Sequence, residues 1–228
     1  MSNPFDFFDK VVYINLRNRV DRKEKMEKLF NQYGINAQRF EAISITKEDN
    51  DDLVRRGCYF YDEERPEYAP RIKSATLSHL TALFHSKLLN VENILILEDD
   101  IFFVEDIKVK LLAATEELKK REWDIFFLGC QPFEAYKETE NISKVIRATS
   151  SHAYCVNGKY IQTLIDEVNF KHHPVIDTVL GHMGRSNNSR SYMTNTPLAI
   201  QEPGHSDIEN TFQDLTLLQN NRYKDNIK

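Results

Sequence analysis

The chain has 228 residues, a length typical of one globular domain. Hydrophobic residues make up 41% of it, with 14 Phe and 10 Tyr, and this is enough apolar surface to close a core, which excludes the disordered and fibrous classes. Lys and Arg total 30 against 35 Asp and Glu, a formal net charge of −5. The chain therefore lacks the basic excess that binding to nucleic-acid phosphates requires.

The sequence carries no recognisable targeting or membrane segment. No window approaches the roughly 20 apolar residues that span a bilayer, and the start, MSNPFDFFDK, lacks the pattern of a secretory signal. We therefore expect a cytoplasmic protein without a transmembrane segment. Cys58, Cys130 and Cys155 are odd in number and widely spaced, which predicts reduced thiols rather than a disulfide framework or a zinc site.

The first third of the chain predicts a β-α-β unit followed by a surface excursion. Residues 11–16, VVYINL, form a β-rich run, and apolar residues at helical spacing follow up to Tyr33. Gly34 stands where a helix usually ends, and residues 35–43 contain a second predicted strand. Residues 46–70 are dense in charge and contain two prolines, so we expect a helix fragment and a long loop there.

The middle of the chain continues the alternation of helices and strands. Residues 73–90 predict a helix with one buried face, residues 94–97 a strand covered on both faces, residues 106–120 a helix, and residues 124–129 another apolar strand. This order favours an α/β fold with a Rossmann-like, mostly parallel sheet.

After Gly129 the pattern becomes irregular. The sequence predicts a loop over 131–141, a strand pair over 144–147 and 151–156, and a helix whose apolar residues lie between Ile161 and Val168. A short helix after Val175, strands over 191–194 and 198–201, and a mobile polar tail complete the predicted elements.

Three acids follow directly on the buried strand 94–97, at the end of a sheet where open α/β folds bind ligands. Because side chains alternate along extended backbone, Glu98 and Asp100 share a side and Asp99 points away. One interpretation is a solvated turn of acids; the other is a divalent cation held by carboxylate oxygens. The abrupt step from apolar strand to three acids favours the cation.

The turn after the first strand is a second candidate, with Asn15, Leu16, Arg19 and Arg22. The chain contains neither G-x-G-x-x-G nor G-x-x-x-x-G-K-[ST], so dehydrogenase and P-loop functions lose their main support. These arginines either pair with phosphate oxygens or are simply solvated.

Two histidines and one acid complete the candidates. His79, on the helix before the acidic strand, has the pattern of a structural histidine, whereas His205 lies in a loop of the kind where binding residues concentrate. Asp177 interrupts an apolar stretch. It is either a partly buried functional carboxylate or a first-turn acid of a helix.

Segments along most of the chain together resemble glycosyltransferase family 25, which includes bacterial lipooligosaccharide galactosyltransferases and procollagen galactosyltransferase domains. The segments that carry the resemblance are, in order, VVYINLRNRVDRKEKM, FEAI, SATLSHLTAL, ENILILEDD, WDIFFLG, SSHAYCVN, HPVIDTVL and QEPGHSDI. The chain differs from the family pattern just before Leu-Ser-His, where Lys73, Ser74 and Ala75 replace the expected glycines and cysteine.

The resemblance implies a single domain of the GT-A type over 1–228, with a nucleotide-binding part of about 1–130, an acceptor-side part of about 131–215 and a polar tail of 216–228. It implies a metal-dependent, inverting hexosyltransferase that uses a UDP-sugar, with UDP-galactose expected and UDP-glucose as the rival. The acceptor would be a saccharide or a hydroxylated peptide. A catalytically degenerate module that binds a sugar or a partner is the alternative from another functional class.

The resemblance also implies roles for individual residues. It assigns Mn²⁺, or another divalent cation, to Glu98, Asp100 and His205, and the general base to Asp177. The residues that it assigns to the nucleotide sugar are Asn15, Leu16, Arg19, Arg22, Ser78, Glu98 and Asp99.

Overall fold

The computed structural model describes residues 3–57, 69–168, 175–185 and 189–228. The elements of the first half are η1 (Pro4–Phe7), β1 (Lys10–Asn15), α1 (Val20–Tyr33), β2 (Ala37–Glu41), α2 (Lys47–Arg55), α3 (Ala69–Leu88), β3 (Asn93–Glu98), β4 (Ile101–Phe103) and α4 (Ile107–Leu118). Those of the second half are β5 (Ile125–Lys137), β6 (Ile142–Asn157), η2 (Gly158–Tyr160), α5 (Ile161–Glu167), α6 (Ile176–His182), β7 (Ser191–Thr194), β8 (Ala199–Gln201), β9 (Gly204–His205), β10 (Phe212–Gln213) and α7 (Thr216–Asn226).

The central sheet contains six strands in the order β2-β1-β3-β6-β5-β7. β1 is parallel to β2 and β3, β5 is parallel to β7, and β6 is antiparallel to both β3 and β5. Every strand of this sheet except β6 therefore points the same way. The predicted α/β fold with a mostly parallel sheet is confirmed.

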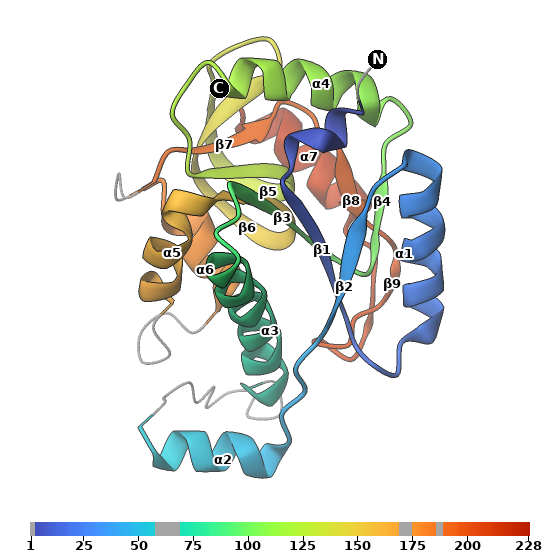
Figure 1. Cartoon of the computed structure of the whole chain (residues 1–228), viewed down its shortest axis with the longest axis vertical. Coiled ribbons are helices and arrows are strands. Elements are labelled where there is room, and N and C mark those ends of the chain that lie inside the picture. The colour runs from blue at the N-terminus through green and yellow to red at the C-terminus, as the bar shows by residue number, and fades with distance from the viewer. Residues whose placement is uncertain (1–2, 58–68, 169–174, 186–188) are drawn as a thin grey trace.

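Helices cover both faces of the sheet (Figure 1). Val12 and Ile14 of β1 pack into a core with residues of α3, α5 and α6, whereas Val11 and Tyr13 pack on the opposite face with residues of α1 and α4. This alternation is the period of two that an extended strand imposes, and it explains why β1 and β3 are continuously apolar. The predicted strand covered on both faces is β3, and that prediction is confirmed.

Most predicted elements lie within a few residues of their observed bounds. α1 ends where expected, because Gly34 adopts the left-handed conformation (φ 67°) that terminates a helix at low steric cost. α2 is the expected helix fragment, and the excursion predicted after it falls largely in residues 58–68, outside the described part. Cys130 and Cys155 are buried free thiols, as predicted, and Cys58 is not described.

The predicted loop over 131–141 and the predicted strand pair are wrong. β5 continues to Lys137, and β6 is one strand from Ile142 to Asn157. The two form a long hairpin whose register shifts several times between Phe127 and Ala135. These irregularities break the alternation that sequence patterns detect, and they bend the hairpin.

The predicted mobile tail is also wrong over most of its length. α7 runs from Thr216 to Asn226 and buries Gln219 and Tyr223. Tyr223 joins the core on the α3 side of the sheet, and Gln219 donates a hydrogen bond to the carbonyl of Ala199 (3.1 Å). Two buried residues one turn apart are enough to dock a helix whose two leucines, Leu217 and Leu218, are exposed and whose remaining residues are polar.

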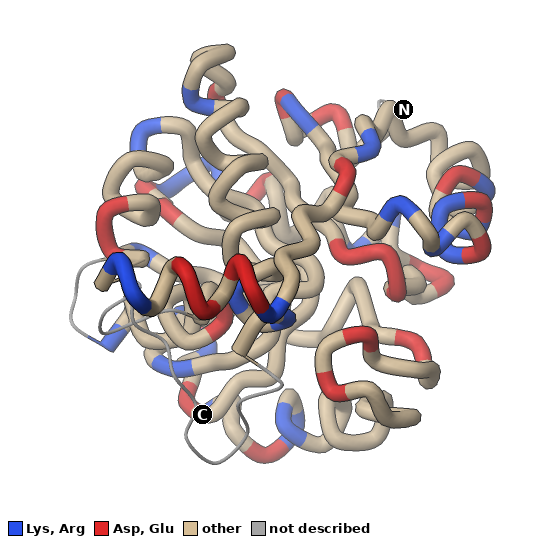
Figure 2. Tube along the Cα trace, turned by 90° about the horizontal axis from the view of Figure 1, so that it is seen from below, with Lys and Arg blue, Asp and Glu red and all other residues tan. Residues whose placement is uncertain are grey.

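Basic and acidic residues are interspersed along the described chain (Figure 2). Within the described residues, no helix is both long enough and apolar enough to cross a lipid bilayer.

α6 lies directly on β6, because two glycines remove the side chains that would separate them. A Cβ atom at Gly181 would come 1.8 Å from the Ala148 carbonyl oxygen, and one at Gly184 would come 2.2 Å from that of Val145. This close approach fixes the position of the first turn of α6, which carries Asp177.

We expect Gly181→Ala to lower the free energy of unfolding by about 1–3 kcal/mol, because α6 must move away from β6. The gain in helix propensity, about 1 kcal/mol, offsets only part of that cost. Gly204→Ala is the control, since the nearest atom to its added Cβ would be 4.0 Å away. Equal denaturation midpoints for the two variants would contradict the argument.

Candidate functional site

A cleft of about 340 Å³ opens at the carboxyl ends of β1 and β3. Both strands run downward in Figure 1, and their carboxyl ends lie near β9. The predicted site residues that line the cleft are Leu16, Arg22, Ser78, Glu98, Asp99 and Asp100. The other residues along its wall are Ile14, Ala42, Ile43, Ser44, Ile45, Arg71, Ser74, Ala75, His79, Gln201, Ser206, Asp207 and Ile208.

Asp99 is held inside the protein by a cation and an amide. Arg22 donates from Nη1 to its Oδ1 (2.7 Å), and Asn15 donates from Nδ2 to its Oδ2 (2.6 Å). Arg39 in turn donates from Nε to Oδ1 of Asn15 (2.8 Å), which fixes the amide. The same Nη1 atom of Arg22 also lies 3.3 Å from Oδ2 of Asp100, so Asp99 does not point away from Asp100 as the alternation predicts. The reason is that β3 ends at Glu98, and the alternation does not continue into the turn.

Glu98 faces the opposite way and contacts α3, β6 and β8. The Ser151 hydroxyl donates to its Oε1 (3.0 Å), His79 Nε2 lies 3.7 Å from the same oxygen, and Gln201 Nε2 lies 3.5 Å from Oε2. Burial opposes its ionisation, yet the contacts with His79 and Ser151 keep the pKa of Glu98 below its usual value. Glu98 is therefore a carboxylate at neutral pH.

Asp100 is the acid with spare coordinating capacity. Its Oδ2 lies 3.3 Å from Arg22, whereas its Oδ1 is buried and has no hydrogen-bond partner among the described residues. Burial and the charges of Glu98 and Asp99 raise the pKa of Asp100 to about 7. A buried acceptor without a partner is costly, and a cation at this oxygen would remove that cost.

The residues present fit a divalent cation. Glu98 and Asp100 line one cleft, and small divalent cations are often bound by only one or two carboxylates, with water and substrate phosphates completing the shell. Across the described ranges no three His, Cys, Asp or Glu side chains are grouped closely enough to hold a metal by themselves. The structure does not bring His205 into a three-residue cluster with Glu98 and Asp100.

His205 lies in a second hollow, of about 270 Å³, which Arg22, Asp99 and Asp100 also line. Its side chain is exposed, and its carbonyl accepts a hydrogen bond from Arg22 Nη2 (2.7 Å). Arg19 reaches the same region, where it pairs with Asp21 (3.0 Å) and with Asp207. The predicted arginines are thus neither free nor simply solvated, because both pair with acids.

Asp177 occupies the first turn of α6 and lies near Glu98. The Ser151 hydroxyl, which donates to Glu98, also interacts with the Asp177 carboxylate, as does the backbone N–H of Ser150. Burial and the charge of Glu98 raise the pKa of Asp177. Asp177 is thus a first-turn acid of α6, one of the two interpretations of the sequence. It is not among the residues that line the cleft, and its role as a functional carboxylate stays a prediction.

Ser150 supports this arrangement with a strained backbone. Its φ of 71° is in the left-handed region, which residues other than glycine rarely adopt. The residue lies where β6 leaves regular register with β5, between the pairs Gly129–Ala153 and Gln131–Thr149. Such strain persists where surrounding contacts enforce it, and it is found most often at functional sites.

Ser74 and Ser78 shape the opposite wall of the cleft. Ser78 accepts the backbone N–H of Ile43 (2.8 Å), and Ser74 accepts that of Ile45 (3.0 Å). The loop after β2 is therefore attached to α3, and its apolar residues face the cleft. Ser78 lies in the predicted place, although its hydroxyl is engaged by the chain itself.

Sequence reasoning misses three residues of the site. The pattern predicts a structural role for His79, yet this residue joins Glu98 to the Tyr154 hydroxyl, 2.9 Å from its Nδ1. Ser151 and Gln201 have no distinguishing pattern of their own. Their segments, SSHAYCVN and QEPGHSDI, are among those that carry the family resemblance, and that is the available signal.

Comparison with known proteins places the chain among glycosyltransferases. The family model "Glycosyltransferase family 25 (LPS biosynthesis protein)" matches residues 8–180. A "Glycosyltransferase 25 family member" of Drosophila melanogaster is 26% identical over 63% of this chain and 25% of that protein. "Procollagen galactosyltransferase 2" of Mus musculus is 24% identical over 69% of this chain and 27% of that protein. The chain thus spans about a quarter of the length of these curated relatives.

Two solved structures are also similar. One is a glycosyltransferase involved in the glycosylation of the major capsid of PBCV-1 (TM-score 0.37, 12% identity, 70% of this chain and 66% of that one). The other is UDP-glucose pyrophosphorylase complexed with UDP-glucose (TM-score 0.42, 8% identity, 84% and 77%). With the family model matched over residues 8–180, which include the whole acidic strand and Asp177, the chain belongs to glycosyltransferase family 25.

Proposed function

We propose that this chain is a metal-dependent, inverting hexosyltransferase that uses UDP-galactose as donor, with UDP-glucose as the rival. The observation that carries the proposal is the acidic end of β3, where Glu98 and Asp100 face one cleft and Asp100 Oδ1 has no partner among the described residues. The acceptor is a saccharide or a hydroxylated peptide.

Glu98 and Asp100 would hold the cation, for which we propose Mn²⁺. When bound, it would act as a Lewis acid that stabilises the charge growing on the leaving diphosphate. His205 as a further ligand stays a prediction, because its side chain is exposed in this structure.

The donor would occupy the cleft between the β2–α2 loop and the acidic turn. Leu16, Ile43 and Ile45 provide an apolar wall for the nucleoside. Arg71 lines the same cleft, donates to the Ile208 carbonyl (3.1 Å), and can present its remaining N–H groups to phosphate oxygens. Arg22 and Asn15 contribute indirectly, since they hold Asp99 and with it the acidic turn.

Asp177 is the proposed general base. An inverting transfer needs one group that accepts the proton of the incoming hydroxyl, and a raised carboxyl pKa makes Asp177 a stronger base than an ordinary aspartate. Ser150 and Ser151 hold it near Glu98, so the base and the proposed metal ligand keep a fixed separation.

The first test is nucleotide release from UDP- and GDP-sugars in the presence of Mn²⁺. We expect UDP release to be fastest with UDP-galactose, to stop in excess EDTA and to return with added Mn²⁺. Asp100→Asn should abolish the metal-dependent release, whereas Asp106→Asn, at the exposed start of α4, should leave it intact. A folded protein that releases no nucleotide from any donor would support the degenerate binding module instead.

Arg22→Ala tests whether the acidic turn depends on its arginine. The variant leaves Asp99 and Asp100 without their cation in a largely buried setting, with 10% and 22% of the two side chains exposed. We expect a loss of about 3 kcal/mol in the free energy of unfolding by chemical denaturation. Arg55→Ala, which breaks an exposed pair with Asp52, should cost less than about 1 kcal/mol. Equal losses in the two variants would show that Arg22 has no such role.

Asp177→Asn tests the proposed base. Loss of a general base typically costs about 10²–10⁴ in rate, so transfer to an acceptor should fall by that order while UDP and Mn²⁺ binding stay nearly unchanged. Asp166→Asn, on the exposed side of α5, is the control. If the Asp177→Asn variant loses donor binding in parallel with activity, the carboxylate belongs instead to the donor site or to the fold.

A further inference from the structure

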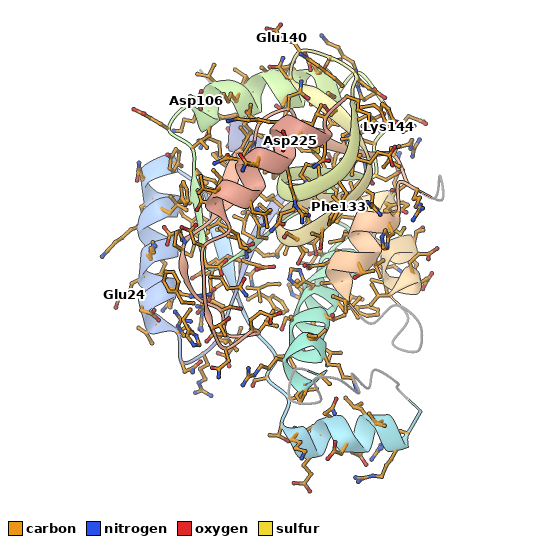
Figure 3. All side chains as sticks on the ribbon, turned by 180° about the vertical axis from the view of Figure 1, so that it is seen from behind. Glu24, Asp106, Phe133, Glu140, Lys144 and Asp225 are labelled. Atoms are coloured by element: carbon orange, nitrogen blue, oxygen red, sulfur yellow. The ribbon has the colours of Figure 1, made fainter. Side chains whose placement is uncertain are left out.

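Two arginines pack against one aromatic ring on a surface that the donor cleft does not include. The guanidinium carbon of Arg222, on α7, lies 4.1 Å from the centre of the Phe133 ring, and that of Arg147, on β6, lies 4.8 Å from it. Phe133 itself is 38% exposed. Figure 3 shows it on the back of the molecule, close to the ribbon of α7.

Neither arginine has an acidic partner in the described part of the chain. Within the described ranges, no ion pair or hydrogen bond joins the side chain of Arg147 or Arg222 to another residue, and Arg147 Nε and Arg222 Nη1 are buried without a hydrogen-bond partner. Arg121 offers a comparison, because it stacks on Tyr192 (5.4 Å) but also pairs with Glu138 (2.5 Å). The arginines at Phe133 thus carry two positive charges that no acid of the described chain pairs with.

The stacking prepares these side chains for an anion. A guanidinium group that lies over a ring uses its flat face, and its N–H donors point outward in its own plane. Those donors match two oxygens of a carboxylate or phosphate. Both guanidinium carbons lie within 5 Å of one ring centre and so at most about 9 Å from each other, close enough for both positive charges to attract one bound anion.

We propose that Arg147, Arg222 and Phe133 form an oxyanion site that binds a carboxylate or phosphate group of the acceptor. Arg147 lies four residues before Ser151 on β6, so the site is roughly 13 Å along the strand from Ser151, which contacts both Glu98 and Asp177. That spacing suits an anionic group on an extended acceptor. The link to the acceptor rests on the proposed transferase function, whereas the anion site does not.

Direct binding tests the site independently of any activity. Titration calorimetry at constant ionic strength would use inorganic phosphate, glucuronate and neutral glucose. We expect saturable binding of at least one of the two anions and none of glucose. The double variant Arg147→Gln/Arg222→Gln should bind that anion at least about tenfold more weakly, because each lost charged hydrogen bond is worth about that factor.

Arg121→Gln is the matched control, since it removes a stacked arginine that already has an acidic partner, and it should bind as the wild type does. Circular dichroism checks that the double variant is folded. If it is not, the anion affinity of Arg222→Lys, which keeps the charge but loses the planar guanidinium group, is compared with that of the wild type instead. Unchanged anion affinity in a folded variant would overturn the proposal. So would binding to anionic phospholipid vesicles without saturable binding of either small anion.

The acceptor arm compares transfer to a glucuronate-containing acceptor with transfer to its neutral counterpart. We expect the double variant to raise KM for the charged acceptor alone and to leave UDP release in the absence of acceptor unchanged. Equal KM changes for both acceptors would show that the site does not recognise an anionic group of the acceptor. If the wild type transfers to neither, the proposed function fails, and the calorimetric result still decides whether the anion site exists.

Discussion

The structure is arranged around the mutual repulsion of three adjacent carboxylates at the end of β3. Like charges so close together must be solvated, paired or neutralised by a cation. Each acid has different partners. Asp99 accepts hydrogen bonds from Arg22 and Asn15, whereas Glu98 accepts one from the Ser151 hydroxyl and lies near His79. Asp100 keeps one oxygen without a protein partner in the described chain. Asp100 Oδ1 is thus the oxygen of the three carboxylates at which a cation would relieve the repulsion most directly.

The compensating contacts also join distant parts of the chain at the cleft. Arg22 comes from α1 and reaches both the acidic turn and the carbonyl of His205, so the segment around β9 is attached to the first helix. Ser151 comes from β6 and links the acidic strand to α6 through Asp177. The expected division into a nucleotide-binding part before residue 130 and an acceptor-side part after it therefore does not divide the cleft. Residues 201–208 contribute to the same cleft as residues of the first part.

The sequence is sufficient where local pattern and tertiary packing agree. β1, β3 and α3 have strong apolar patterns, and the alternation correctly places Glu98 and Asp99 against different partners, although it ends with β3 at Glu98. It is insufficient where the structure depends on pairing between distant segments. Pro132 and Glu134 resemble loop residues, yet they lie in β5 because a hairpin with shifted register accommodates them. The environment of His79 depends on Glu98 and Tyr154, which no local pattern brings beside it.

The departure from the family pattern at Lys73, Ser74 and Ala75 can now be given a physical meaning. Ser74 donates to the carbonyl of Pro70 (2.7 Å) within α3 and accepts the N–H of Ile45, which a glycine could not do. Lys73 is buried and donates to Asn50 of α2 (2.8 Å). Serine and lysine also favour a helix more than glycine does, by a few tenths to about 1 kcal/mol each. Lys73 and Ser74 thus stabilise α3 and attach the loop that lines the cleft. A degenerate module would not need residues that stabilise the wall of this cleft, so their presence favours the transferase.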